Sequence, residues 1–234
     1  MAGDTLADRS TVAVVTGAGR GIGRAIAQRL ARQHAVLAVA RTESELRETG
    51  AASDAIRVHV ADIGASGAVD GVATAAAALG TLRVWVNNAA HVDRVAFAEL
   101  DDTAWRRTMA VNLDAVFAGC RAAVRGMVGG GVIVNIASLS GVANVEKFPG
   151  LAAYNVSKAG VAALTEAVAL EGRDAGICCV CLSPGAVDTE MLRRAAPHLR
   201  PGTTPEDVAA IVEFLVSDAA APLSGSNIPI FSNR

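Results

Sequence analysis

The sequence lacks the excess of positive charge that binding to nucleic acid or to an anionic membrane would require. Lysine and arginine total 21, aspartate and glutamate total 23, and the formal net charge is −2. No apolar run approaches the ~18 residues of a membrane-spanning helix. The first ten residues, MAGDTLADRS, contain no apolar core of a secretory signal. We therefore expect a cytoplasmic protein that binds neither nucleic acid nor a membrane.

Cysteine is also scarce, and its placement argues against a metal site. The four cysteines are residues 120, 178, 179 and 181, and three of them lie in the apolar run ICCVCLS. A metal site would need further Cys or His at ligand spacing, and none follows. We expect no bound metal and interpret these cysteines as small buried side chains in a strand.

Hydrophobic residues make up 52% of the chain and charged residues 19%, a composition that indicates a folded domain. Short apolar runs predict strands at 11–16, 35–40, 56–60, 82–86, 131–137, 176–182 and 227–231. Longer helical patterns lie between them, at 21–33, 66–79, 101–128, 150–172 and 206–217. This alternation predicts one α/β domain over residues 1–234, with residues 1–10 as a flexible arm. We expect a Rossmann-like, doubly wound, seven-stranded, mostly parallel sheet with helices on both faces.

A glycine-rich segment, TGAGRGIG (16–23), joins the first predicted strand to the first predicted helix. Glycine lets the backbone turn sharply and approach a pyrophosphate, and the start of a helix offers free N–H groups. Gly17, Gly21 and Gly23 have the spacing G-x-x-x-G-x-G. Because the segment lies between a strand and a helix, it predicts a dinucleotide site. The alternative is a tight turn that binds no ligand.

The residues after the second predicted strand bear on the choice of dinucleotide. An NAD site favours an acid there, which binds the ribose 2′-OH, but this strand is followed by Arg41. A guanidinium suits a 2′-phosphate, and Arg20 in the glycine segment is a second candidate for it. The two arginines predict NADP(H) in preference to NAD(H). Glu43 lies close to this position, so NAD(H) remains an alternative cofactor.

Tyrosine and lysine are the rarest functional side chains, yet they occur four residues apart in AAYNVSKAG (152–160). Tyr154 is the only tyrosine of the chain, and Lys158 is one of only two lysines. Residues i and i+4 share one face of a helix. An ammonium near a phenol favours the phenolate, so we expect Lys158 to lower the pKa of Tyr154. The pair therefore predicts an acid/base group.

With these motifs the chain resembles the short-chain dehydrogenase/reductase family in its ordinary single-domain form, from about residue 11 to about 230. The resemblance is carried by TGAGRGIG, NNAA (87–90), Asn112 in MAVNLDAVF, Ser138 in NIASLSG, YNVSK, and SPGAVDT (183–189). It implies that Tyr154 is the proton donor to a carbonyl, or the base for an alcohol, and that Lys158 lowers its pKa and holds the nicotinamide ribose. Ser138 would hydrogen-bond the substrate oxygen, with Ser140 as a nearby rival. Asn112 would anchor a water that leads from Lys158 to solvent.

The resemblance also implies a set of cofactor-binding residues, which includes Tyr154 and Lys158. The others are Gly17, Arg20, Gly21, Ile22, Gly23, Arg41, Asp62, Ile63, Asn88, Ala89, Ala90, Pro184, Gly185, Val187 and Thr189. The sequence thus predicts an NADP(H)-dependent oxidoreductase that transfers hydride between the nicotinamide and a ketone or secondary alcohol. A non-catalytic NADP(H)-binding sensor or scaffold is the alternative, and in such a protein some of the catalytic residues of the family pattern would be replaced.

Two further expectations come from the comparison with the family pattern. The family assembles through helices equivalent to 101–128 and 150–172, so a homo-oligomer, dimer or tetramer, is expected. The segment at 142–150 is longer than is usual in the family. It is expected to bring Lys147 and Phe148 towards the substrate mouth, either to alter specificity or as a surface bulge.

Overall fold

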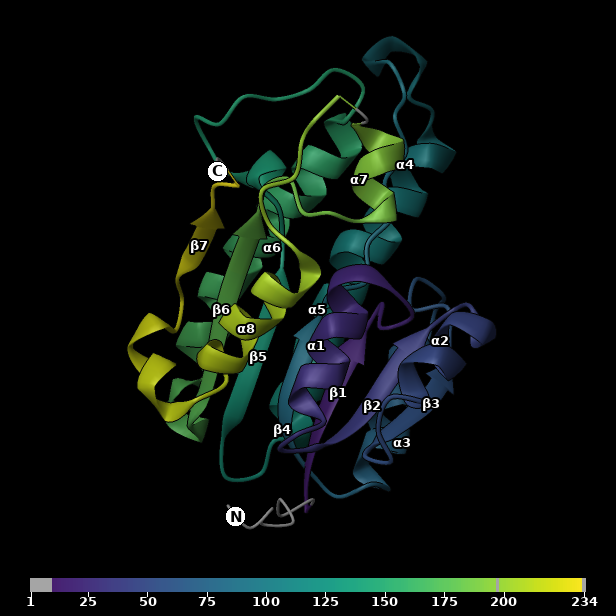
Figure 1. The fold of residues 1–234 in the computed structure, drawn as a ribbon. Coiled ribbons are helices and arrows are strands. Elements are labelled where there is room, and N and C mark those ends of the chain that lie inside the picture. The colour runs from purple at the N-terminus through teal and green to yellow at the C-terminus, as the bar shows by residue number, and fades with distance from the viewer. Residues whose placement is uncertain (1–9, 197, 233–234) are drawn as a thin grey trace.

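In the computed structural model, residues 10–196 and 198–232 are described, and within them seven strands form one sheet (Figure 1). The strand order is β3-β2-β1-β4-β5-β6-β7, and every neighbouring pair is parallel. The strands are β1 (Thr11–Thr16), β2 (Ala35–Ala40), β3 (Ile56–Val60), β4 (Thr81–Asn87), β5 (Gly131–Ile136), β6 (Ile177–Pro184) and β7 (Asn227–Ile230). The predicted doubly wound α/β fold is confirmed. The predicted arm at 1–10 lies outside the described residues except for Ser10.

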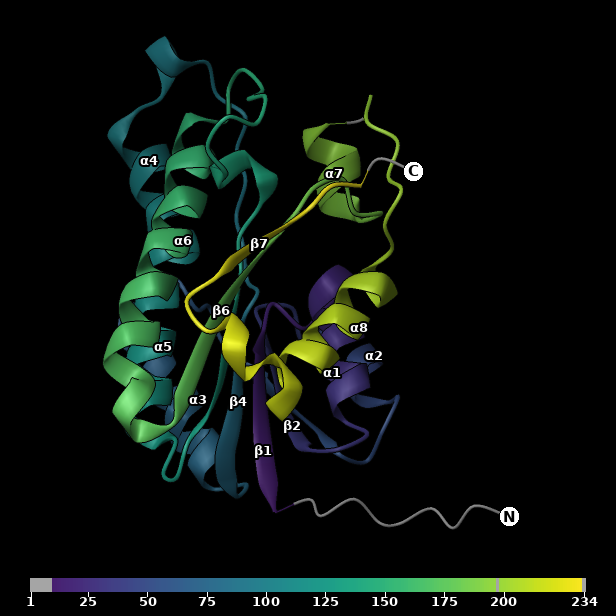
Figure 2. The ribbon, with the colours of Figure 1, turned by 90° about the vertical axis from the view of Figure 1, so that its left-hand side faces the viewer.

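Helices cover both faces of the sheet, as Figure 2 shows. One face carries α1 (Gly21–Leu30), α2 (Glu43–Gly50) and α8 (Pro205–Leu215); the other carries α3 (Ala68–Ala77), α5 (Ala115–Gly126) and α6 (Ala152–Gly172). Side chains of β1 alternate between two hydrophobic cores: Ala13 and Val15 pack into one, Val12 and Val14 into the other. A strand that is buried on both faces has a nearly continuous apolar sequence, which is why the inner strands could be predicted.

The structure corrects the predicted helices. The stretch 101–128 is not one helix: α4 (Asp102–Met109) passes into a π-helical turn, η2 (Ala110–Asp114), before α5 begins. Two helices, α2 and α7 (Glu190–Ala195), were not predicted. Only two residues of α2 are buried and none of α7, so neither has an apolar stripe. Short 3-10 turns complete the chain: η1 (Phe97–Glu99), η3 (Leu139–Gly141), η4 (Arg173–Ala175) and η5 (Asp218–Leu223).

The topology fixes where a ligand site can form. After β1 the chain builds outwards through β2 and β3, then returns to place β4 on the other side of β1. Ligands of such sheets bind outside the carboxyl ends of the strands, at the point where the order reverses. These ends lie at the upper edge of the sheet in Figure 1, below α7 and the long loops.

Candidate active site

A cavity of about 900 Å³ opens at the carboxyl edge of the sheet. Its lining includes Ser138 together with every predicted cofactor-binding residue: Gly17, Arg20, Gly21, Ile22, Gly23, Arg41, Asp62, Ile63, Asn88, Ala89, Ala90, Tyr154, Lys158, Pro184, Gly185, Val187 and Thr189. Asn112 is the one predicted site residue outside the lining, because it is fully buried. One cavity therefore contains side chains that are more than a hundred residues apart in the sequence.

The glycine segment has the shape of an anion site. A Cβ on Gly17, whose φ is +66°, would lie 2.8 Å from the Ala89 Cα. A Cβ on Gly23 would lie 2.2 Å from the Gly17 carbonyl oxygen, so both positions require glycine. No described side chain caps α1, and its first turn carries no acid. The open N–H groups and the positive end of the helix dipole therefore fit a pyrophosphate.

Two residues that the sequence did not indicate brace this segment. The Thr49 hydroxyl donates a hydrogen bond to the Ala18 carbonyl at 2.9 Å, and Arg24 Nε donates to the Gly19 carbonyl at 2.9 Å. Thr49 is fully buried. Because it lies on α2, which was not predicted, only the fold brings it to the loop.

The end of β2 carries the residues predicted to choose the dinucleotide. Arg41 is exposed at the cavity, and its guanidinium has no partner within the described part of the chain. Arg20 instead lies between two acids, with Nη1 3.4 Å from Glu45 Oε1 and a second ion pair to Glu190. Glu43, the acid that left NAD(H) as an alternative cofactor, pairs with Arg47 and is not part of the cavity lining.

The expected adenine end of the cavity follows β3. Asp62 and Ile63 both line the cavity there. Asp62 Oδ1 accepts a hydrogen bond from the Gly64 N–H at 3.1 Å, which fixes the turn that follows the strand.

The predicted catalytic side chains converge where β5 meets α6. Ser138 follows β5, and its Oγ accepts a hydrogen bond from the Ser140 N–H at 3.1 Å. Ser140 also lines the cavity, so it is placed beside Ser138 as the sequence suggested. Lys158 donates from Nζ to the Ile136 carbonyl at 2.8 Å, and Nζ lies 5.7 Å from the centre of the Tyr154 ring.

Burial drives both titratable groups towards their neutral forms. Lys158 is 2% exposed, and burial lowers its pKa from 10.5 to about 8. Burial likewise raises the pKa of the Tyr154 phenol, an effect that Ser138 partly opposes. The pKa of Tyr154 is therefore shifted in the opposite direction to the one predicted, because desolvation of the phenol outweighs the effects that favour the phenolate.

Asn112 acts behind the cavity wall, in the π-helical turn η2. Its side-chain oxygen accepts a hydrogen bond from the His91 N–H at 2.7 Å, and its Nδ2 donates to the His91 carbonyl at 2.8 Å and to the Ser157 hydroxyl at 3.1 Å. Single π turns in helices are common at functional sites. Asn112 thus connects the loop after β4 to α6, where its partner Ser157 lies three residues after Tyr154.

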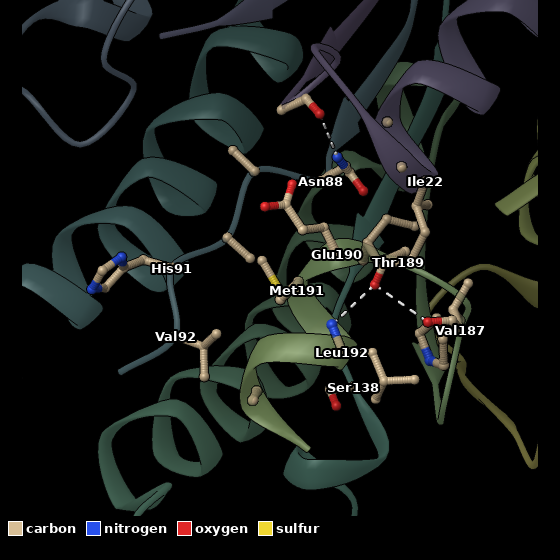
Figure 3. Close-up of a pocket in the computed structure, with 18 of the residues that line it drawn as sticks. Ile22, Asn88, His91, Val92, Ser138, Val187, Thr189, Glu190, Met191 and Leu192 are labelled. Atoms are coloured by element: carbon tan, nitrogen blue, oxygen red, sulfur yellow. Dashed lines mark hydrogen bonds between the residues drawn. The ribbon is translucent and has the colours of Figure 1, made fainter. Parts of the chain in front are cut away.

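The segment that follows β6 closes one side of the cavity and leads into α7 (Figure 3). Thr189 caps α7 by accepting a hydrogen bond from the Leu192 N–H at 3.2 Å, and its hydroxyl donates to the Val187 carbonyl at 3.3 Å. On the opposite wall, Asn88 Nδ2 donates to the Thr16 carbonyl at 2.9 Å, joining the ends of β4 and β1.

The long loop at 142–150 contributes only in part to the cavity. Phe148 lines it and packs edge-on against His198, with ring centres 5.8 Å apart. Lys147 is not part of the lining, and its Nζ donates to the carbonyls of Val142 and of Leu139, the latter at 3.2 Å and itself a lining residue. Arg94 joins this loop to α7 by donating to the carbonyls of Pro149 and Ala195.

Comparison with known proteins identifies the family. The model for "short chain dehydrogenase" matches residues 11–200. A 3beta-hydroxysteroid dehydrogenase 2 of Eggerthella lenta is 35% identical, covering 93% of this chain and 92% of the relative. A 2-(R)-hydroxypropyl-CoM dehydrogenase of Xanthobacter autotrophicus is 37% identical, covering 93% of this chain and 95% of the relative. The chain belongs to the short-chain dehydrogenase family.

A solved structure supports the same assignment. A single-residue variant of actinorhodin polyketide ketoreductase, solved with NADPH, aligns with a TM-score of 0.87 and 29% identity, over 97% of this chain and 98% of the other. This short-chain dehydrogenase is therefore an oxidoreductase of alcohols and ketones, and the family's cofactor is a nicotinamide nucleotide. All four catalytic positions of the family pattern are filled, so the alternative of a non-catalytic sensor or scaffold has no support.

Two other kinds of feature are absent from the part of this short-chain dehydrogenase that the structure describes. Among the described residues, no helix combines the length and the apolar character needed to cross a bilayer. The same residues contain no group of three or more His, Cys, Asp or Glu side chains arranged to hold a metal ion.

Proposed function

We propose that the protein is an NADP(H)-dependent oxidoreductase that reduces a ketone, or oxidises a secondary alcohol, with Tyr154 as the general acid/base. One observation carries the proposal: the Tyr154, Lys158 and Ser138 side chains line the same cavity as the glycine segment and Arg41. An acid/base group and an anion site thus lie at one edge of one sheet. Positioning of that kind is a major source of rate in enzymes.

Each side chain has a role that its geometry supports. A bound reduced nicotinamide supplies hydride to the carbonyl carbon. Ser138 hydrogen-bonds the substrate oxygen, and Tyr154 transfers its phenolic proton to that oxygen. The Lys158 ammonium, held by the Ile136 carbonyl, stabilises the phenolate that results. The pKa of about 8 keeps Lys158 mostly protonated near neutral pH.

The preference for NADP(H) is supported by the residues after β2. The strand ends in Ala40, and Arg41 follows it at the cavity with an unpaired guanidinium in the described part of the chain. A guanidinium matches the geometry of a phosphate and can bind it with two hydrogen bonds. Arg41 is therefore the principal residue for a ribose 2′-phosphate.

A panel of carbonyl compounds tests the activity. The protein is mixed with NADPH and with ketosteroids, cyclic ketones, keto sugars or acyl thioesters, and the loss of NADPH absorbance is followed. Turnover of at least one class is expected, and Tyr154→Phe should lose it while still binding NADPH. Unchanged turnover in the Tyr154→Phe variant would refute the assigned acid, and binding without turnover across the panel would refute the reaction.

We also propose assembly into a homo-oligomer through α5 and α6. Both helices expose apolar side chains: Phe117 and Val124 on α5, and Val156 and Leu170 on α6. Light scattering is expected to give a dimer or tetramer. The variant Phe117→Glu should shift the mass towards the monomer, and a wild-type monomer would contradict the proposal.

A further inference from the structure

Glu45 faces the cavity from α2, a helix that the apolar pattern of the sequence does not predict. It lies in the first turn of α2 and lines the cavity together with Arg41 and Thr42. A Cβ built on Gly19 would lie 3.0 Å from Glu45 Oε2 and 3.1 Å from its Cβ. Glycine at position 19 therefore leaves room for this carboxylate beside the glycine segment.

Glu45 and Glu190 share the guanidinium of Arg20. Arg20 Nη1 lies 3.4 Å from Glu45 Oε1, and the same nitrogen pairs with Glu190 at the start of α7. The Glu45 side chain is 30% exposed and that of Arg20 is 48% exposed, so solvent only partly screens the pair. Glu190 also pairs with Arg194, whereas the Glu45 carboxylate pairs with Arg20 alone among the described residues. Arg20 is thus already engaged by two carboxylates, of which only Glu45 has no second cation.

The two arginines that could select a 2′-phosphate are therefore not equivalent. Arg41 has no ion-pair partner in the part of the chain that the structure describes, whereas Arg20 is held by acids. A phosphate that enters this end of the cavity must compete with Glu45 for Arg20 and must also approach a carboxylate of its own sign. A ribose that bears only a 2′-OH meets neither cost, and a carboxylate accepts hydrogen bonds from hydroxyl groups.

We infer that Glu45 is a specificity-determining residue: by holding Arg20 it weakens the preference for a 2′-phosphate and allows the site to accept NAD(H) as well as NADP(H). This inference rests on the proposed function, which it refines. At a partly exposed site a charge contact of this kind changes relative affinity by about tenfold. Removing the carboxylate should therefore increase the preference for the phosphorylated nucleotide by about that factor.

Calorimetric titration with 2′,5′-ADP and with ADP tests the inference without catalysis. The proteins are wild type, Glu45→Gln and the matched control Glu48→Gln. Glu48 also lies on α2 and pairs with an arginine, Arg24, at 2.9 Å, but it is 66% exposed and lies outside the cavity lining. The ratio of the two affinities should rise about tenfold in Glu45→Gln and change by less than about twofold in Glu48→Gln. An unchanged ratio in Glu45→Gln, or an equal rise in the control, would overturn the inference.

A second comparison tests the route through Arg20. In the Arg20→Ala background, adding Glu45→Gln should give a clearly smaller rise in the ratio, because only the repulsion between the carboxylate and the phosphate is then relieved. A rise as large as in the wild-type background would overturn the assigned route through Arg20. Failure of the proposed function is read separately, as absent turnover in the carbonyl panel or as wild-type protein that favours ADP outright. The change in ratio between variants remains decisive in either case.

Discussion

Replacing Lys158 with methionine tests the electrostatic cost of burying an ammonium beside the phenol. Methionine has a similar length and no charge. Lys158 is 2% exposed, and its pKa falls from 10.5 to about 8 because of burial. Since one pKa unit corresponds to about 1.4 kcal/mol, the charged side chain costs the folded state about 3 kcal/mol near neutral pH.

The pH dependence of this cost follows from proton linkage. The pKa of the folded state is lower than that of the unfolded chain, so the unfolded chain binds more protons between about pH 8 and pH 10.5. The cost is therefore present in full below that window and disappears above it. Lys158→Met also loses the hydrogen bond to the Ile136 carbonyl, worth about 1 kcal/mol. We expect the variant to be about 2 kcal/mol more stable than wild type near pH 7, with a smaller difference near pH 10.

Urea unfolding without added nucleotide measures the difference in stability between Lys158→Met and wild type near pH 7 and near pH 10. Fluorescence of the fully buried Trp85 reports the transition. Lys147→Met is the matched control, because it removes the other lysine of the chain from an exposed loop. Tyr154 is present in all three proteins, so its own titration largely cancels. A Lys158→Met variant that is less stable than wild type near pH 7, or a difference that does not narrow with rising pH, would refute the reasoning.

Three further predictions address the cavity. Arg41→Asp should weaken binding of NADPH relative to NADH by at least ~10-fold, and an unchanged ratio measured by fluorescence titration would remove Arg41 as the selector. Ser138→Ala should lower kcat/KM by on the order of 10²-fold, with Ser140→Ala as the control for the rival hydroxyl; the larger loss in Ser140→Ala would reverse the assignment. Tyr154 is the only tyrosine, so ultraviolet absorbance reads its ionisation directly: its pKa should lie above the ordinary value, and a value below it would contradict the role of burial.

The strands and the placement of Tyr154 beside Lys158 in the cavity could be predicted because their physical signals are local. The strands β1, β2, β4, β5 and β6 are covered on both faces, so each has a largely apolar run that does not depend on the neighbouring segments, whereas the edge strands β3 and β7 are partly exposed. Tyr154 and Lys158 share one helical face, and their rarity elsewhere in the chain made the spacing conspicuous. The glycine spacing was equally informative, since Gly17 and Gly23 make contacts that any side chain would block.

The features that were not predicted depend on contacts between distant residues, which no local sequence pattern encodes. The helix α2 is short and charged, so it carries no apolar stripe and was not predicted. The positions of Glu45 and Thr49 at the cavity and the glycine segment were therefore not predicted either. The π-helical turn at Asn112 arises within a sequence that reads as continuous helix, and its hydrogen bonds to His91 join residues that lie 21 positions apart. The pKa of Tyr154 was predicted in the wrong direction because spacing reveals the neighbouring charge but not the depth of burial.

The burial of Tyr154 has a consequence for catalysis in each direction. A phenol whose pKa is raised retains its proton, which suits a donor to a carbonyl oxygen but hinders removal of a proton from an alcohol. Burial also favours the neutral form of Lys158, so deeper burial of this side chain would reduce the positive charge that stabilises the phenolate. Oxidation of an alcohol therefore relies on the groups that favour the phenolate, which are the Ser138 hydrogen bond and the Lys158 ammonium, whose Nζ lies 5.7 Å from the centre of the Tyr154 ring. We therefore predict that, near neutral pH, Tyr154 donates its proton to a carbonyl oxygen more readily than it accepts one from an alcohol.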